Sequence, residues 1–427
     1  MVGSERAAAA STGIRRRPCT SERHSVAPAA STDGLLARAT FTYTRAVTTV
    51  ESFTLLDTTI RVTSDDPATL IWLREVLTPP FALGPNGGRT LEVDVATAPS
   101  RYRDVAASRP TGELAAIPCF AGDRTLTYRP GWEHDGRIVA DEHRLGALYV
   151  LSKGRVEVLA SPGTSRVRTA TMRVVRELAV ARALSDPACV LIHAAAAAPS
   201  VGAVLFAGPR ECGKTTTLAS VVRATRAGVL TNDRTLLRRT ADGWTAYGIP
   251  TIVNVRPGTL ALMPDFAAAL GRIAAGSDRT VAEAMAAHAR GAATDATKLS
   301  VAQLAAALDA ERAGPTPLAA IVFPDRRAAH DEITIERMTG ADAAHGIATA
   351  RFGQHAERDV PTAFARLADA ARPPGAEEAL LARLAVEVPC FSARLGAAAL
   401  QTAAGGTRLL AAVGRGVRHR PMERTGA

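Results

Sequence analysis

The stretch GPRECGKTTT, Gly208–Thr217, decides the fold that we expect for this chain. Its first eight residues match the pattern G-x-x-x-x-G-K-[ST], in which a glycine-rich turn binds phosphate through backbone N–H groups. A chance match in this chain has a probability on the order of a few in a thousand. An apolar run, AVLFA, precedes the loop, and a helix-compatible run, TTTLASVVRA, follows it. The stretch therefore predicts a strand, a phosphate-binding loop and a helix in succession.

The lysine of this loop stands out because the chain otherwise uses arginine. Of 51 basic residues, three are lysines: Lys153, Lys214 and Lys298. A compact ammonium fits between phosphate oxygens where the planar fork of arginine is too wide. We therefore expect Lys214 to bind the β- and γ-phosphates of ATP, and the Thr215 hydroxyl to bind Mg²⁺. The predicted nucleotide-binding residues are Gly208, Pro209, Arg210, Glu211, Cys212, Gly213, Lys214, Thr215 and Thr216.

Two residues outside the loop are expected at the phosphates. Asp233 ends a strand 18 positions after Thr215 (233 − 215 = 18), which leaves room for a helix. If that strand lies beside the strand of the loop, the Asp233 carboxylate can bind Mg²⁺ or accept the proton of an attacking hydroxyl. A hairpin turn near residue 200 would place His193 opposite Ala207, next to the first glycine.

The patterns along the chain predict its domains. Short alternating runs such as TTIRVTS (58–64) and RVEVLAS (155–161), with one helix at 66–77 among them, are typical of an α+β domain. The expected segments are a disordered tail (1–35), an N-terminal α+β domain (36–165), a P-loop nucleotide-binding domain (166–340), a mostly helical extension (341–412) and a basic tail (413–427). The expected later elements are helices at 169–184, 214–225 and 264–311, and strands at 189–197, 203–208, 228–233, 317–325 and 388–395.

Composition argues against secreted, zinc-binding and membrane proteins. The five cysteines lie far apart and form no C-x-x-C pair, which fits neither a disulfide framework nor a zinc cluster. The longest apolar run, 189–208, is interrupted by a Pro-Ser turn, and no apolar segment follows the N-terminal IRRRP. We expect a cytoplasmic protein with no signal peptide and no membrane partner.

The net charge of +10 raises the question of nucleic-acid binding. Residues 1–35 carry five Arg and three acids (5 − 3 = +2), and residues 406–427 carry five Arg and one Glu (5 − 1 = +4). The remaining charge is spread thinly, so no basic stripe of the kind that a nucleic-acid groove needs is present. We expect no nucleic-acid partner. The alternative, binding through the tails, predicts a steep salt dependence that vanishes when both tails are removed.

Three runs carry a resemblance to a known family. LIHAAAAA (191–198), VLFAGPRECGKTTTL (204–218) and GVLTNDRTLL (228–237) resemble the catalytic core of the HPr kinase/phosphorylase family, and more closely the HPr-kinase-related proteins that lack its usual N-terminal domain. In that family a histidine lies 15 positions before the first glycine, as His193 does here (208 − 193 = 15). The second acid of a pair after the helix is the proton acceptor, and the resemblance assigns that role to Asp233. Thinner resemblance extends over 55–185 and 315–395.

The resemblance implies an α/β fold: a P-loop domain with an HPr-kinase-like core, preceded by a smaller α+β domain. It implies ATP-dependent phosphoryl transfer to a Ser or Thr hydroxyl of a protein or peptide. The catalytic residues would be Asp233, His193 and Lys214, and the Mg²⁺ ligands Thr215 and Asp233. Arg256 and the pair Arg326–Arg327 could neutralise charge on the transferring group, unless they are simply solvated. A homo-oligomer is compatible with the sequence.

The sequence also departs from the family pattern. The family has a second metal-binding Glu where this chain has Tyr247–Pro250, with no acid between Asp242 and Asp265. The first acid of the pair is the amide Asn232. Fewer carboxylates imply weaker Mg²⁺ binding. The alternative function is therefore an ATP-binding regulatory or interaction module with weak or no transferase activity.

Overall fold

The structure is a computed structural model of the 427-residue chain. It describes residues 48–86, 88–122, 125–161, 166–277, 296–325, 330–353, 360–372 and 375–418. The predicted tail 1–35 and the pair Arg326–Arg327 lie outside these ranges. The described residues fall within one contiguous unit of the chain, Ala46–Ala427.

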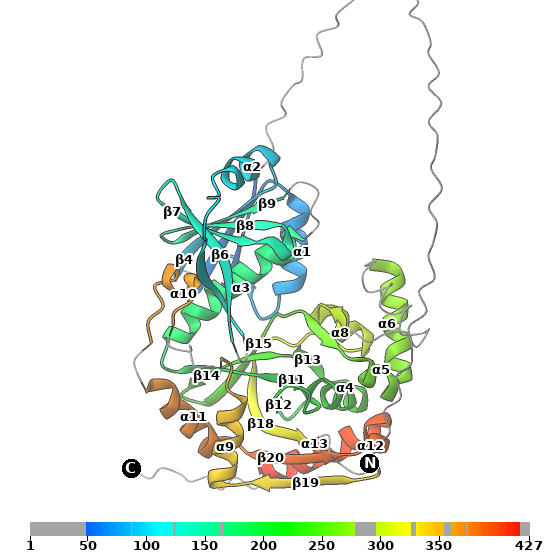
Figure 1. Cartoon of the computed structure of the whole chain (residues 1–427). Coiled ribbons are helices and arrows are strands. Elements are labelled where there is room, and N and C mark those ends of the chain that lie inside the picture. Colours follow the sequence, from blue (N-terminus) through cyan, green and yellow to red (C-terminus); the bar gives the residue numbers. More distant parts are fainter. Residues whose placement is uncertain are drawn as a thin grey trace, which may run out of the picture. The chain divides into compact units, whose positions relative to one another are not determined.

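The N-terminal half of the described chain contains a nine-stranded mixed sheet (Figure 1). Its strands are β1 (Thr49–Leu55), β2 (Thr58–Ser64), β3 (Ala82–Leu83), β4 (Arg89–Ala96), β5 (Ala115–Ala121), β6 (Leu126–His134), β7 (Arg137–Glu142), β8 (Ala147–Ser152) and β9 (Arg155–Ala160). The order is β3-β1-β2-β4-β9-β8-β7-β6-β5. Strand β4 pairs in parallel with β2 and β9, and the other neighbours are antiparallel.

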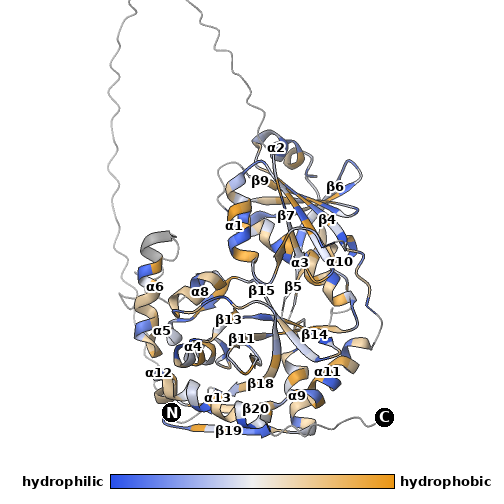
Figure 2. Ribbon diagram, turned by 180° about the vertical axis from the view of Figure 1, so that it is seen from behind, coloured by the Kyte–Doolittle hydropathy of each residue, from blue (hydrophilic) through white to orange (hydrophobic). Residues whose placement is uncertain are grey.

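Helices cover both faces of this sheet. Apolar residues of α1 (Pro67–Leu77) and α3 (Val167–Ser185) share a core with one face, and Val105 of α2 (Pro99–Ala107) packs on the other. The α1 helix confirms the prediction at 66–77. Its N-cap is Asp66, whose carboxylate accepts a hydrogen bond from the Ala68 N–H. Figure 2 shows both hydrophobic and hydrophilic residues along α1, as expected for a helix with one buried face.

The second helix of this region, α2, was not predicted. Its one buried residue is Val105, so it offers no apolar periodicity from which a helix could be inferred. The only sequence signal was Pro99 at its first turn, a position that proline favours. A short 3₁₀ turn, η1 (His143–Leu145), also lies between two strands.

A second mixed sheet follows. Its strands are β10 (Cys189–Ile192), β11 (Ala194–Ala198), β12 (Ala203–Ala207), β13 (Gly228–Thr231), β14 (Arg234–Thr240), β15 (Gly243–Ile249), β18 (Thr316–Asp325), β19 (Ile333–Met338) and β20 (Cys390–Leu395). The order is β10-β14-β15-β18-β12-β11-β13, and β20 pairs with both β18 and β19. Strand β12 lies between β18, which is parallel to it, and β11, which is antiparallel. The described chain is therefore mixed α/β, as predicted at that level.

Helices also flank this sheet on both sides. They are α4 (Lys214–Thr225), α5 (Pro257–Leu262), α6 (Pro264–Ser277), α8 (Val301–Ala307), α9 (Gly340–Ala350), α11 (Ala376–Glu387), α12 (Ala397–Gln401) and α13 (Ala403–Arg418). The short helix α10 (Ala363–Leu367) instead packs on the first sheet, where Phe364 contacts Phe120 of β5 and Tyr149 of β8. Val204 and Phe206 of β12 belong to the cluster that contains Leu218 of α4, whereas Leu205 belongs to the cluster that contains Ile347 of α9. The alternation places α4 and α9 on opposite faces, which Figure 1 also shows.

The α13 helix packs directly against α4. A Cβ at Gly406 would lie 2.5 Å from the carbonyl oxygen of Ser220, so the two helices approach closely only because this position is glycine. Val413 is buried in the same cluster as Leu218. Because this part of α13 is buried, the helix extends to Arg418. The first residues of the segment predicted as a basic tail (413–427) are therefore helical.

Two predicted elements differ from the structure. The helical stretch expected at 264–311 is interrupted by β17 (Thr297–Leu299), which pairs with β16 (Val253–Val255). The apolar run 189–208 is divided among β10, β11 and β12. No helix of the described ranges is long and apolar enough to cross a membrane.

Candidate functional site

The predicted strand, loop and helix follow one another in the structure. Strand β12 ends at Ala207, and α4 begins at Lys214 as predicted. Gly208 and Gly213 have φ angles of 138° and 107°, which side chains disfavour. A Cβ at Gly208 would also meet the Cys212 sulfur at 3.0 Å. The loop conformation therefore requires its two glycines.

The ammonium of Lys214 lies inside the curve of the loop. Its Nζ donates to the carbonyl oxygens of Gly208 and Pro209, at 2.8 Å each. The residue is 7% exposed. Two residues after Lys214, the Thr216 hydroxyl is 2.9 Å from that of Thr259, which ties the helix start to α5. The first turn of α4 and the loop are thus held in one arrangement.

A cleft of about 430 Å³ opens beside this loop. Six of the nine predicted nucleotide-binding residues line it, together with His193 and Asp233. The six are Arg210, Glu211, Gly213, Lys214, Thr215 and Thr216. Gly208 and Pro209 line a separate cavity of about 460 Å³ next to α9. Cys212 is half-buried within the loop and lines neither.

The two residues predicted outside the loop meet at this cleft. The His193 Nε2 lies 3.0 Å from the Asp233 Oδ1. His193 is 8% exposed, and the Asp233 side chain is 41% exposed to the cleft. The edge of the imidazole also contacts the Phe352 ring, with centroids 6.1 Å apart. The histidine is therefore turned toward the carboxylate and the cleft.

The strand that leads to Asp233 is not placed as predicted. Strand β13 pairs with β11, which separates it from β12, the strand of the loop. Because both pairings are antiparallel, β13 and β12 still run in the same direction and end at the same edge of the sheet. The insertion of β11 arises from the hairpin at 198–203, whose returning strand occupies the position next to β12.

The register of that hairpin was predicted one residue off. Ala194, not His193, pairs with Ala207, because the four residues of the turn shift the centre of the hairpin. His193 belongs to neither strand: it separates β10, which pairs with β14, from β11. Its N–H donates to the Ala350 carbonyl oxygen at 2.7 Å. Because His193 is not paired with a neighbouring strand, its backbone can adopt the conformation that directs the imidazole at Asp233.

The pKa of the Asp233 carboxyl lies below its ordinary value of 3.8. Desolvation in the cleft raises this pKa, but the hydrogen bond from His193 and the positive charges of His193, Arg234 and Lys214 together lower it more. The carboxylate is therefore ionised at neutral pH. It can accept a proton or bind a cation.

Arg234 and Phe352 are among the residues that border the cleft and that sequence reasoning missed. Arg234 directly follows Asp233, and its guanidinium lies 4.2 Å from the centroid of the Phe352 ring. The sequence position of Arg234, directly after Asp233, was a signal, but a weak one because arginine is so common in this chain. For Phe352, which is far away in sequence, no local signal exists. Arg256, considered from the sequence, lines the cleft and pairs with Glu211 at 2.7 Å.

Arg234 is held by a buried ionic cluster. Its Nη1 donates to the Glu177 Oε1 of α3 at 2.8 Å, and its Nη2 donates to the Ala121 carbonyl oxygen at 3.1 Å. The Nη2 of Arg176 donates to the same Glu177 oxygen at 2.8 Å. All three charged residues are buried. The cluster joins the cleft to α3 and, through Ala121, to the first sheet.

Oxygen atoms of the cleft match what a hard cation prefers. Its described carboxylates are Asp233 and Glu211. The Oδ1 of Asn232 is buried without a hydrogen-bond partner, and Asn232 lines the cleft. Tyr247, which the resemblance places where the family has a second acid, lies outside the cleft on β15. No cluster of three or more His, Cys, Asp or Glu suited to a metal occurs among the described residues.

Comparison with known proteins gave no match, either to a protein-family model or to a curated sequence.

Proposed function

We propose that this chain binds ATP with Mg²⁺ and transfers the γ-phosphoryl group to a Ser or Thr hydroxyl of a protein or peptide, in the manner of the HPr-kinase-like proteins that it resembles. The observation that carries the proposal is the convergence of Lys214, Thr215, His193 and Asp233 on one cleft. The carboxylate and imidazole are hydrogen-bonded to each other there. A glycine-rich turn at a helix start supplies N–H donors and a partial positive charge for phosphates.

The oxygen donors of the cleft fit Mg²⁺. The Thr215 hydroxyl, the Asp233 carboxylate and the orphaned Asn232 Oδ1 are the hard ligands that this ion prefers. When bound with ATP, Mg²⁺ would neutralise charge on the phosphate oxygens. A site with one full carboxylate should bind the ion weakly without nucleotide.

The roles of the chain's own groups follow from their positions. The Lys214 ammonium would leave the two carbonyl oxygens that it now contacts and bind phosphate oxygens. The ionised Asp233 would accept the proton of the acceptor hydroxyl as its oxygen attacks the γ-phosphorus, and ADP would leave. His193, hydrogen-bonded to Asp233, would fix the orientation of that carboxylate.

A direct test is the detection of a phosphorylated product. The protein would be incubated with γ-labelled ATP, Mg²⁺ and candidate protein and peptide acceptors, and products would be mapped by mass spectrometry. Label on a Ser or Thr supports the proposal. Label that appears only as inorganic phosphate, with ATP bound, contradicts the transfer step.

The nucleotide-binding half has its own prediction. Lys214→Met should weaken ATP binding about tenfold or more, because a charge-assisted hydrogen bond to phosphate contributes about 1.5–3 kcal/mol. Lys153→Met, at an exposed turn of the first sheet, is the matched control and should leave affinity unchanged. Titration calorimetry measures both. Equal affinities for the two variants would contradict the role of Lys214.

The second candidate is an ATP-binding interaction module with weak or no transfer. The observation that favours it is the small number of acids at the cleft: by the resemblance, Asn232 stands there in place of one family acid, and Tyr247, in place of the other, lies outside the cleft. Such a module would bind ATP as tightly as the kinase but yield no phosphorylated acceptor. Its partner would bind with an affinity that depends on nucleotide.

A further inference from the structure

A second cavity, of about 850 Å³, adjoins the cleft and is separate from the nucleotide-binding loop. The two spaces share the side chains of Arg234 and Phe352. The volume lies within the range of small-molecule sites, about 300–1,000 Å³. Nothing in the proposed reaction with ATP accounts for this space.

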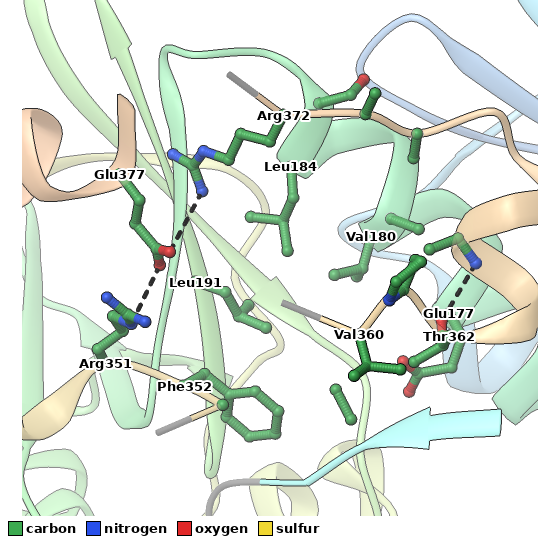
Figure 3. Close-up of a pocket in the computed structure, with 18 of the residues that line it drawn as sticks. Glu177, Val180, Leu184, Leu191, Arg351, Phe352, Val360, Thr362, Arg372 and Glu377 are labelled. Atoms are coloured by element: carbon green, nitrogen blue, oxygen red, sulfur yellow. Dashed lines mark hydrogen bonds and ion pairs between the residues drawn. The ribbon is translucent and has the colours of Figure 1, made fainter. Parts of the chain in front are cut away.

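One part of the cavity wall is apolar. Val180, Ala181 and Leu184 of α3 and Leu191 of β10 line it, with Val360 opposite them (Figure 3). The side chains from α3 and β10 belong to the large core cluster or pack against it, so this side of the wall is a fixed surface, whereas Val360 is 37% exposed. It suits the apolar body of a ligand.

The other part of the wall carries two arginines with few partners. Figure 3 shows Arg351 and Arg372 on either side of Glu377. Their contacts with Glu377 are long, 3.5 Å for Arg351 and 3.9 Å for Arg372. The Arg351 side chain is 9% exposed, and its one hydrogen bond among the described residues runs to Glu378 at 3.3 Å.

The two guanidinium groups therefore have more donors than acceptors. Each has five N–H groups, but Arg372 donates one side-chain hydrogen bond, to the Cys189 carbonyl oxygen. The Nε atoms of both are buried without a hydrogen-bond partner. Desolvation lowers the pKa of Arg372, although the charges of Glu377 and Glu378 raise it. Both arginines are half-buried, and the exposed fractions of the Arg351 and Arg372 side chains are 9% and 19%. A partly desolvated cation with unused donors favours an acceptor-rich anionic group.

We propose that this cavity binds an amphiphilic carboxylate, a small molecule whose apolar body packs on α3 and Leu191 and whose carboxylate accepts hydrogen bonds from Arg351 and Arg372. The site goes beyond the proposed kinase activity and requires no nucleotide. Because Arg234 and Phe352 form a wall of both spaces, a bound ligand would lie beside the cleft that holds Asp233.

The test uses two fluorescent probes of similar shape. Anilinonaphthalene sulfonate has an apolar body and an oxyanion, and N-phenyl-1-naphthylamine has the same rings without the charge. Arg351→Met should weaken sulfonate binding about tenfold, as expected for about 1.4 kcal/mol of lost interaction, and leave the neutral probe within about twofold. Arg408→Met, at an exposed position of α13, is the matched charge control and should change neither.

A second variant tests the apolar wall and does not depend on the arginines. Ala181→Trp should fill the cavity and abolish binding of both probes, whereas Val386→Trp, at a position 87% exposed, should abolish neither. Circular dichroism would verify the fold of each variant. Retention of both probes by folded Ala181→Trp would overturn the site.

A competition experiment on the wild-type protein tests whether the ligand's carboxylate contributes to binding. Octanoate should displace the sulfonate probe at a concentration about tenfold lower than octan-1-ol, because the chains match and the charges differ. Equal displacement by the two would overturn the assignment of a carboxylate ligand. So would an equal effect of Arg351→Met on both probes.

Discussion

Replacing Asp233 by asparagine should reduce the rate of phosphoryl transfer by about 10²–10⁴-fold, the usual contribution of a general base. Asparagine matches the shape of aspartate and retains an oxygen within reach of the His193 Nε2, which is 3.0 Å from the present carboxylate. It cannot take up a proton at neutral pH. The variant isolates proton transfer from the arrangement of the cleft. Single-turnover kinetics with labelled ATP and an identified acceptor would measure the loss.

ATP affinity should respond differently. Removing a negative charge beside the phosphates does not weaken their binding in the absence of Mg²⁺, so affinity should not fall there. Asp242→Asn, in an exposed turn, is the matched control for both measurements. If Asp233→Asn lost as much ATP affinity as Lys214→Met, the separate roles of base and phosphate ligand would be wrong.

The ionisation of Asp233, which is hydrogen-bonded to His193, predicts how the transfer rate depends on pH. The pKa of Asp233 is held below 3.8, so the base form is complete above that value and is lost only as the pH falls through the lowered pKa. Loss of activity between about pH 5 and 8 should therefore not arise from protonation of Asp233. The His193→Ala variant should raise the pKa of Asp233, because the hydrogen bond disappears and desolvation remains. Carboxyl carbon chemical shifts would report it.

Replacing Glu177 by glutamine should lower the free energy of unfolding by about 3–5 kcal/mol, the range found when one partner of a buried ion pair is removed. Glu177 is 7% exposed and accepts hydrogen bonds from Arg176 and Arg234. Without its charge, two buried guanidinium groups would repel each other. Burial and the neighbouring Arg234 already lower the pKa of Arg176 to about 10. Urea unfolding would measure the loss.

A surface pair provides the control. Glu92→Gln removes a carboxylate that pairs with Arg61, whose side chain is 55% exposed, and should cost less than about 1 kcal/mol. If the Glu177 and Glu92 variants unfolded at the same urea concentration, the buried cluster would not be a source of stability.

At acidic pH, the free energies of unfolding of the wild type and of Glu177→Gln should become equal. Desolvation raises the pKa of Glu177, but Arg234 and Arg176 outweigh it, so the pKa lies below the ordinary 4.5. The stability that the charge contributes is present above pH 4.5 and is lost as the pH falls through the lowered pKa. The two unfolding free energies should therefore converge below pH 4.5.

Local features of the site could be predicted from the sequence because short-range chemistry sets them. The glycines at 208 and 213 are needed for positive φ angles, and α4 starts at Lys214 as the pattern predicts. His193 and Asp233 were expected near the loop, and both line its cleft. The register that led to His193 was one residue off, however, and β13 lies one strand further from β12 than expected. Neighbouring registers and strand orders are compatible with the same apolar pattern.

The sequence by itself determined the glycine-rich turn, the helix after it, the scarce lysine, and the mixed strand and helix content, because backbone conformation and apolar periodicity act over a few residues. Only the tertiary structure decided that Arg234 and Phe352 form a wall between two cavities, and that the half-buried Arg351 and Arg372 each have a buried Nε without a hydrogen-bond partner. Arg234 and Phe352 are 118 residues apart in the sequence (352 − 234 = 118), and Arg372 donates to the carbonyl oxygen of Cys189, 183 residues away. Such contacts follow from the packing of whole sheets and helices, which no local pattern encodes.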